Sequence, residues 1–308
     1  MTEPRLLVSV PGETLRRAIG TPPEGVEIVL WDMDSPAPAD HIDLVVPPYM
    51  GAADRLGALE GVSTRLVQSQ SIGYDDVAGV LPPGQVFANA ASVHETSTAE
   101  LTLALVLAAQ RGIPDFVRAA EQGRWAPARH ASLADRRVLL LGYGGVGRAI
   151  EARLAPFEVE TVRVATRARD DAEGRIHGID ELPELLPTAD IVIVGVPLTD
   201  ATTGLVDDAF LSALPDGALV VNIARGKVAD TDAIVDHATR GRLRFALDVT
   251  DPEPLPPGHR LFALPNVLIS PHVGGASTAM MPRMARLVRE QIERMLRGDE
   301  PLNVVLRT

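Results

Sequence analysis

Three side chains that can transfer protons or bind anions follow three predicted strands in the last third of the chain. They are Arg225 in the segment 221–226, Glu253 in 246–256 and His272 in 269–275. The carboxyl ends of parallel strands form the ligand-binding edge of an open α/β sheet, so we expect the three side chains to converge there. Imidazole exchanges a proton near neutral pH, a nearby carboxylate favours its charged form, and a guanidinium binds carboxylates. The trio therefore predicts acid–base chemistry on an anionic substrate.

A glycine-rich turn lies between a predicted strand at 138–141 and a predicted helix that continues through 149–154. In the pattern Gly-x-Gly-x-x-Gly, Gly142 permits the tight bend, Gly144 lets the backbone approach phosphates, and Gly147 allows close packing of helix and strand. The N-terminus of the helix offers free N–H groups to an anion. We therefore predict a dinucleotide site that includes Gly142, Tyr143, Gly144, Gly145, Val146 and Gly147.

The second strand of a nucleotide-binding fold normally ends in an acidic residue that accepts hydrogen bonds from the ribose of NAD. Here the strand end reads Val-Ala-Thr-Arg-Ala-Arg over 164–169, without an acid. Thr166 leaves room for a 2′-phosphate, and Arg167 and Arg169 can donate hydrogen bonds to it. These residues favour NADP(H) over NAD(H), although NAD(H) remains possible. The alternative is that both are exposed loop arginines, since Lys227 is the only lysine and nearly every cation is an arginine.

Two series of predicted strands would position these residues. Apolar runs at 6–10, 26–30, 44–46, 65–68 and 85–88 alternate with segments of crossover length, which predicts a small parallel α/β domain. A second series, at 138–141, 161–165, 190–196, 218–223, 244–249 and 267–270, matches the doubly wound nucleotide fold. We predict an α/β protein in which a Rossmann domain accompanies a smaller, flavodoxin-like domain.

Two predicted helices complete this organisation. Ser97 and Glu100 form a capping-box pattern before the apolar stretch 101–109, which we expect to be buried between domains or subunits. A helical pattern at 285–297 lies too far from the last strand to be only its cap, so we expect it to return to the first domain. The predicted boundaries are 1–95 with 276–308 for the substrate-binding domain, and 96–275 for the dinucleotide-binding domain.

The chain resembles the D-isomer-specific 2-hydroxyacid dehydrogenase family, which includes glyoxylate/hydroxypyruvate reductases and D-3-phosphoglycerate dehydrogenases. The resemblance covers nearly the whole chain. It rests on the ordered set of motifs at 72–75, 97–101, 142–147, 196–199 with 203–205, 221–226, 246–256 and 269–275. It implies an NAD(P)-dependent oxidoreductase that interconverts a 2-oxo acid and its D-2-hydroxy acid.

The resemblance also implies roles for individual residues. His272 is the acid/base, Glu253 orients it and favours its charged form, and Arg225 holds the 2-oxo acid. The backbone at Ile72 and Gly73 completes the carboxylate site, and Tyr49 is a further candidate for substrate contact, with loop packing as its alternative. The remaining cofactor contacts are expected at Val196, Pro197, Ile223, Asp248 and Gly274, with Asp248 facing the nicotinamide carboxamide.

The sequence gives less information about which 2-oxo acid is the substrate. The uncharged stretch 68–71 does not suggest a phosphate pocket, so a small substrate of the glyoxylate or hydroxypyruvate type is favoured. Glu253 argues against the formate dehydrogenase branch, which has Gln at the matching place. We expect the other six histidines to be surface or capping residues, and we expect no metal site. They are His41, His94, His130, His177, His237 and His259.

Composition sets the remaining limits. The chain has 308 residues, no cysteine and a formal charge of −12, which excludes a thiolate nucleophile and disfavours nucleic acid or anionic membranes as partners. No stretch is long enough to span a membrane and the N-terminus lacks a signal pattern, so a cytoplasmic enzyme is expected. The resemblance suggests a homodimer formed through the nucleotide domain. Two rival functions are a nucleotide-sensing corepressor-like binding protein and a hydrolase that retains its nucleotide.

Overall fold

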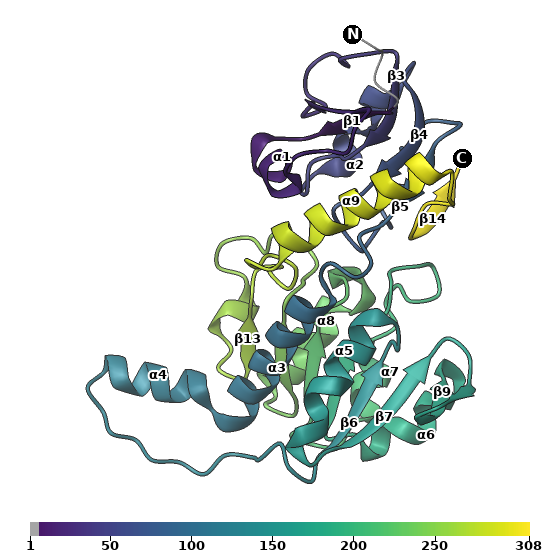
Figure 1. Ribbon diagram of the computed structural model, residues 1–308. Coiled ribbons are helices and arrows are strands. Elements are labelled where there is room, and N and C mark those ends of the chain that lie inside the picture. The colour runs from purple at the N-terminus through teal and green to yellow at the C-terminus, as the bar shows by residue number, and fades with distance from the viewer. Residues whose placement is uncertain (1–5) are drawn as a thin grey trace. The chain divides into compact units, whose positions relative to one another are not determined.

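The computed structural model describes residues 6–308, which divide into two compact units (Figure 1). Of the described residues, unit 1 contains 6–94 together with 277–308, and unit 2 contains 95–276. These limits lie within one residue of the predicted domain boundaries. Each unit has its own parallel sheet and its own apolar core.

Unit 1 is built on a six-stranded sheet in the order β14-β5-β4-β3-β1-β2. The strands are β1 (Leu6–Val10), β2 (Val26–Leu30), β3 (His41–Val45), β4 (Ser63–Gln68), β5 (Val86–Ala88) and β14 (Val304–Arg307). Only β14 pairs antiparallel. The order 2-1-3-4-5 of the first five strands is that of flavodoxin, so the flavodoxin-like expectation is confirmed. All five strands predicted between residues 6 and 89 are present.

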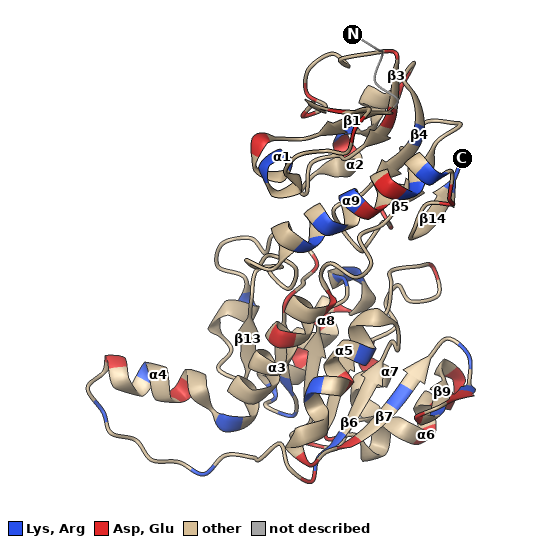
Figure 2. Ribbon diagram, in the orientation of Figure 1, with Lys and Arg blue, Asp and Glu red and all other residues tan. Residues whose placement is uncertain are grey.

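The helices of unit 1 are α1 (Glu13–Ile19), α2 (Ala52–Arg55) and α9 (Met280–Arg297), with a 3₁₀ turn at Leu56–Leu59. Helix α9 returns to unit 1 as predicted and packs beside α1. Its apolar side chains Met284, Leu287, Val288 and Ile292 recur at helical spacing and are buried in the core. Basic and acidic residues follow one another along the length of α9 (Figure 2).

Unit 2 contains an eight-stranded sheet in the order β13-β12-β11-β10-β6-β7-β9-β8. The predicted strands are β6 (Arg137–Leu141), β7 (Glu160–Ala165), β10 (Ile191–Val194), β11 (Leu219–Asn222), β12 (Arg244–Leu247) and β13 (Val267–Ile269). The chain order reverses between β6 and β10, which creates the switch point where doubly wound folds bind ligands. The Rossmann prediction is confirmed.

Two strands of this sheet were not predicted. They are β8 (Arg169–Asp171) and β9 (Gly174–Gly178), which form an antiparallel hairpin beyond β7. Sequence periodicity misses them because β8 contains no apolar residue and β9 buries only Ile176 as a large apolar side chain. Arg169, for which an exposed loop position was the alternative to phosphate binding, is therefore the first residue of a strand.

The helices of unit 2 are α3 (Glu95–Arg111), α4 (Ile113–Glu121), α5 (Gly145–Leu154), α6 (Leu182–Leu185), α7 (Asp208–Ala213) and α8 (Thr231–Thr239). Short 3₁₀ turns lie at Ala155–Phe157, Ile179–Glu181, Leu186–Thr188, Gly226–Val228 and Arg260–Ala263. The predicted helix start at Ser97 is wrong, because α3 begins at Glu95 and Ser97 is buried within its first turn. Helix α3 packs on α5, β11 and β12, so contacts within this one chain bury Leu103 and Val106.

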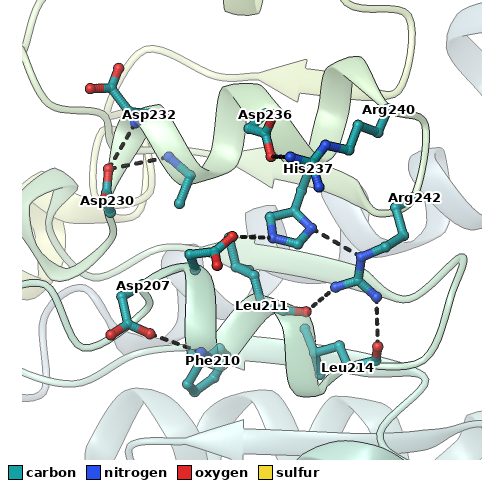
Figure 3. A network of polar contacts seen from close by, with 12 residues as sticks. Asp207, Phe210, Leu211, Leu214, Asp230, Asp232, Asp236, His237, Arg240 and Arg242 are labelled. Atoms are coloured by element: carbon teal, nitrogen blue, oxygen red, sulfur yellow. Dashed lines mark hydrogen bonds and ion pairs between the residues drawn. The ribbon is translucent and has the colours of Figure 1, made fainter.

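A buried histidine joins α7 to α8 (Figure 3). The Nε2 atom of His237 lies 3.0 Å from Oδ1 of Asp208, and its Nδ1 accepts a hydrogen bond from Nε of Arg242 at 3.0 Å. Because arginine can only donate, Nδ1 is unprotonated and Nε2 carries the proton. The expectation of a surface or capping role is wrong for His237, whose exposed fraction is 2%. His259, by contrast, caps the 3₁₀ turn at Arg260–Ala263.

Helix α4 and the chain that follows it project away from the body of unit 2 (Figure 1). Gly112, in the left-handed region with φ +63°, separates α4 from α3. Only Ala119 of α4 is buried, and residues 124–132 have no regular secondary structure. The exposed apolar side chains here are Ile113, Phe116, Val117 and Trp125, and Trp125 is 96% exposed. We call residues 112–132 the arm.

Candidate active site

The glycine-rich turn after β6 has the geometry of an anion cradle. Gly142 has φ +109°, and a Cβ atom there would overlap the backbone of Gly195, while a Cβ at Gly147 would overlap the carbonyl of Gly142. A Cβ at Gly144 would meet nothing within 4 Å. Gly144 also precedes α5 without a side-chain cap, so the first N–H groups of α5 are open to a ligand. Gly142 and Gly147 thus serve the fold, and the space at Gly144 suits a phosphate.

The side chain of Tyr143 points into the protein. It is 4% exposed, its ring has the guanidinium carbons of Arg148 and Arg163 at 4.9 and 5.3 Å from the ring centre, and its hydroxyl donates to Glu151. Burial, followed by the bond to Glu151, raises the pKa of this hydroxyl well above its usual value. Arg163 also donates to the carbonyl of Glu173 at 2.7 Å. The cluster ties α5 to the β8–β9 hairpin and leaves only the backbone of Tyr143 for a ligand.

The end of β7 exposes Thr166, Arg167 and Arg169. Within residues 6–308, neither arginine side chain has a hydrogen-bond or ion-pair partner. No acidic side chain occupies the strand end between Val164 and Arg169. The structure therefore leaves two guanidinium groups available beside the position that the ribose occupies in a Rossmann fold.

His272 and Glu253 lie in contact. The Nδ1 atom of the histidine is 2.5 Å from Oε1 of the glutamate, and their side chains are 39% and 41% exposed. The other oxygen of Glu253 accepts a hydrogen bond from the Thr250 amide at 3.4 Å. Nδ1 thus faces the carboxylate, and Nε2 is the ring atom left to exchange a proton with a substrate.

Asp248, at the end of β12, shapes the segment that carries His272. Its buried carboxylate accepts hydrogen bonds from the Ser270 hydroxyl at 2.6 Å, the Val273 amide at 3.0 Å and the Gly274 amide at 2.9 Å. Its 3% exposed fraction fits this structural task. We predicted only a nicotinamide contact for Asp248, and the sequence holds no pattern that would have shown the positioning role.

Arg225 follows β11, the neighbour of β12 in the sheet. Asn222 donates to the Arg225 carbonyl at 3.1 Å and accepts from the Ala224 amide at 3.0 Å, which closes a tight turn before the arginine. A Cβ on Gly226 would overlap the backbone of Thr250, so this turn and the one before Glu253 touch. β11, β12 and β13 thus bring Arg225, Glu253 and His272 to one edge of the sheet. Sequence reasoning missed the parts played by Asn222 and Gly226.

The remaining predicted positions lie on turns at the ends of strands. In unit 2, Val196 is buried, Pro197 is exposed and Ile223 is half-buried. In unit 1, the amides of Ile72 and Gly73 donate no hydrogen bond to any residue from 6 to 308. The Tyr49 ring stacks on His94, with 5.6 Å between ring centres, which fits the loop-packing alternative. Over the described residues, no group of three or more acidic or histidine side chains is placed to hold a metal, and no helix could cross a membrane.

A Rossmann unit with an open glycine cradle and a His–Glu pair at its ligand-binding edge defines a nucleotide-dependent oxidoreductase. Residues 103–274 match the family model described as D-isomer specific 2-hydroxyacid dehydrogenase, NAD binding domain. The chain belongs to this family. It is an NAD(P)-dependent D-2-hydroxyacid dehydrogenase, which acts on a CH–OH group.

Curated relatives and solved structures agree with this membership. Glyoxylate reductase/hydroxypyruvate reductase from Homo sapiens is 30% identical over 89% of both chains. Glyoxylate reductase from Korarchaeum cryptofilum is 29% identical over 98% of this chain and 96% of the relative. A D-isomer specific 2-hydroxyacid dehydrogenase from Xanthobacter autotrophicus, solved with NADPH and MES, is 28% identical with a TM-score of 0.81 over 98% of both chains. The NADPH-dependent glyoxylate/hydroxypyruvate reductase of Sinorhizobium meliloti, solved with NADP and malonate, is 27% identical with a TM-score of 0.78 over 98% of this chain and 97% of that one.

Proposed function

We propose that this protein reduces a small, unphosphorylated 2-oxo acid, of the glyoxylate or hydroxypyruvate type, to the D-2-hydroxy acid with NADPH. The observation that carries this proposal is the 2.5 Å contact between His272 and Glu253 at the ligand-binding edge of the Rossmann unit. It gives the sheet edge a proton donor held by a carboxylate, which carbonyl reduction requires.

Cofactor binding is assigned to the turn at Gly142–Gly147 and the end of β7. The empty space at Gly144 and the uncapped start of α5 fit a pyrophosphate. When bound, the nicotinamide supplies the hydride. Val196 and Gly274 are assigned to cofactor contacts, and Pro197 and Ile223 to the adenosine and nicotinamide pockets. Asp248, already bonded to three donors, has lone-pair capacity left for the carboxamide.

The acid–base step is assigned to His272. Glu253 holds Nδ1 and orients the ring, so Nε2–H can donate its proton to the carbonyl oxygen as negative charge develops there. Arg225 binds the substrate carboxylate and the same oxygen, which fixes the carbonyl carbon for attack. The unpaired amides of Ile72 and Gly73 complete the carboxylate site. Arg225 thus orients the substrate, and His272 protonates its carbonyl oxygen.

The preference for a small, unphosphorylated substrate follows from the loops after β3, β4 and β5 in unit 1. Their only acidic side chains are Asp75 and Asp76, and their only histidine is the buried His94. A phosphate on the substrate would find no exposed cation in this part of unit 1. The relatives named glyoxylate reductase support the same class.

The preference for NADPH rests on Thr166, Arg167 and Arg169. The double variant Arg167→Ala/Arg169→Ala should raise KM for NADPH by about 10- to 100-fold, because the bonds that both guanidinium groups donate to the 2′-phosphate are lost. This change corresponds to about 1.4–2.7 kcal/mol of binding free energy for the two exposed side chains together. KM for NADH should stay within about twofold, because NADH has no 2′-phosphate. A higher kcat/KM with NADH in the unaltered protein would overturn the preference.

We also propose a homodimer, with the arm as its contact surface. The apolar side chains Phe116, Val117 and Trp125 are exposed on one short segment, and such a group on a globular unit marks a protein-binding surface.

The deciding experiment is a screen of 2-oxo acids with both reduced nucleotides, followed at the absorbance of the nicotinamide. We expect oxidation of NADPH with glyoxylate or hydroxypyruvate and formation of the D-hydroxy acid on chiral chromatography. No turnover with any 2-oxo acid would remove the proposal.

A further inference from the structure

His94 lies between two loops of unit 1 that follow neighbouring strands. It is the last residue of the first segment of that unit, directly before α3, and its exposed fraction is 4%, so the expected surface position is wrong. Its ring stacks on Tyr49, which follows β3, with an angle of 20° between the two planes. Its Nε2 atom lies 2.6 Å from the backbone carbonyl of Gln70, which follows β4. A carbonyl can only accept, so Nε2 carries a proton and donates it.

The bond to Gln70 is one of three that fix consecutive carbonyls in the loop. The Ser71 carbonyl accepts from the Ala90 amide at 2.9 Å, and the Ile72 carbonyl accepts from the Asn89 side-chain amide at 2.9 Å. All three donors come from the segment after β5. The carbonyls of 70–72 are thus bonded to this segment, whereas the amides of Ile72 and Gly73 donate to no residue from 6 to 308 and are available to a ligand.

A second tie joins the same loop to the loop after β3. The side-chain amide of Gln70 donates to the carbonyl of Pro47 at 2.9 Å, and Gln70 is itself 4% exposed. His94 therefore contacts one loop through its ring and the other through its proton. Removing the proton donor would leave the Gln70 carbonyl without this partner in a buried place, which favours a shift of the loop.

We propose that His94 is a positioning residue for substrate binding: it sets the place of the Ile72 and Gly73 amides by holding the Gln70 carbonyl. This inference rests on the proposed function, in which those amides bind the substrate carboxylate. His94 does not touch the reacting atoms, so its loss should weaken binding of the 2-oxo acid and leave the chemistry of His272 intact.

Two variants distinguish the contribution of the His94 N–H donor from that of its ring. His94→Phe keeps a ring against Tyr49 and removes the donor, whereas His94→Gln keeps an N–H donor and removes the ring. We expect His94→Phe to raise KM for glyoxylate about tenfold, with kcat and KM for NADPH within about twofold. His94→Gln should recover most of that loss. His41→Phe, the same change at an exposed histidine at the opposite end of the same sheet, is the control and should leave KM unchanged.

The outcomes distinguish this inference from the proposed function. If the unaltered protein reduces no 2-oxo acid, the proposed function fails and this inference fails with it. If it does reduce one, an unchanged KM in folded His94→Phe overturns the inference alone. A fall in kcat with constant KM in His94→Phe also overturns the inference. So does a failure of His94→Gln to recover the loss, because either result would mean that the Nε2 donor of His94 does not position the substrate-binding amides. Should His94→Phe not fold, His94→Asn, whose shorter amide falls short of Gln70, replaces it against His94→Gln with the same expected rise in KM.

Discussion

The backbone amide of His272 donates a hydrogen bond to the backbone carbonyl of Asp248, with 2.7 Å between the nitrogen and the oxygen. The carboxylate of the same aspartate accepts from Ser270 on one side of the histidine and from Val273 and Gly274 on the other. His272 has φ +52°, in the left-handed region that residues other than glycine rarely adopt. Asp248 thus holds the histidine in an unusual backbone conformation from the neighbouring strand end.

This relationship makes Asp248→Asn a sharp test. An amide has one accepting atom instead of two, so an N–H of Val273 or Gly274 loses its acceptor, at a cost of about 1–3 kcal/mol. We expect the free energy of unfolding in urea to fall by that amount and kcat for 2-oxo acid reduction to fall at least tenfold. Asp236→Asn, the same change at an exposed residue of α8, is the control. Full activity in Asp248→Asn would contradict a positioning role.

The His272–Glu253 pair has a matched control elsewhere in unit 2. We expect His272→Asn to lower kcat by about 10²- to 10⁴-fold through loss of the proton donor, and Glu253→Gln to lower it by roughly tenfold through loss of a charge-assisted bond. Fluorescence titration should show NADPH affinity unchanged, because neither residue belongs to the glycine turn. His177→Asn alters a similar pair, 2.7 Å from Glu181, and should leave kcat unchanged. Equal losses in His177→Asn and His272→Asn would indicate a structural effect.

Sequence patterns were sufficient where a function needs a fixed local geometry. The turn at Gly142–Gly147 requires glycine for close backbone approaches, and the strands before Arg225 and His272 are short apolar runs. Their order along the chain then places the strand ends at one edge, because parallel strands of a doubly wound sheet share their direction.

The missed features depend on contacts between distant segments. The β8–β9 hairpin is polar and is held by Arg163 of β7, so no period in its own residues marks it. The buried places of His94 and His237 follow from partners at Gln70 and Asp208, and histidine alone gives no preference between core and surface. Helix α3 begins at Glu95, two residues before the predicted capping position, and Ser97 is buried inside the helix.

Alanine substitutions at Gly144 and Gly147, two glycines of the same turn, should have different effects. Gly144→Ala adds a methyl group to empty space, so we expect an unchanged melting temperature and a KM for NADPH raised roughly tenfold as the methyl meets the phosphates. Gly147→Ala forces an overlap with the carbonyl of Gly142, so we expect a loss of about 1–3 kcal/mol in unfolding free energy. Differential scanning fluorimetry and steady-state kinetics distinguish the two. A destabilised Gly144→Ala would show that this glycine serves the fold instead.

If the arm forms the homodimer contact, charged substitutions on it should convert the dimer into a monomer. Val117→Glu combined with Trp125→Glu places two charges on a surface that is exposed in the single chain, so the fold should be unaffected. We expect light scattering after gel filtration to show a dimer for the unaltered protein and a monomer for the variant, because two unpaired charges would be desolvated in the contact. Val80→Glu, at an apolar position of unit 1 that is 46% exposed, is the control and should remain dimeric. A monomeric unaltered protein would end the proposal of a homodimer.

The raised pKa of the Tyr143 hydroxyl should make the stability of the protein depend on pH in the alkaline range. Burial, the bond to Glu151 and the negative charges of Glu151 and Glu173 raise the pKa of its hydroxyl, and Arg163 opposes them. In the unfolded chain the phenol ionises near pH 10, while the folded protein still keeps it neutral. Above that pH the unfolded state therefore loses a proton that the folded state retains, so this contribution to stability is present below about pH 10 and is lost as the pH rises further.

We expect Tyr143→Phe to lower the melting temperature slightly at pH 8. The fall in melting temperature between pH 8 and pH 11 should be smaller in this variant than in the unaltered protein. Lys227 and the other alkaline groups are common to both proteins, so an equal fall in the two would show that Tyr143 ionises as readily in the folded protein as in the unfolded chain.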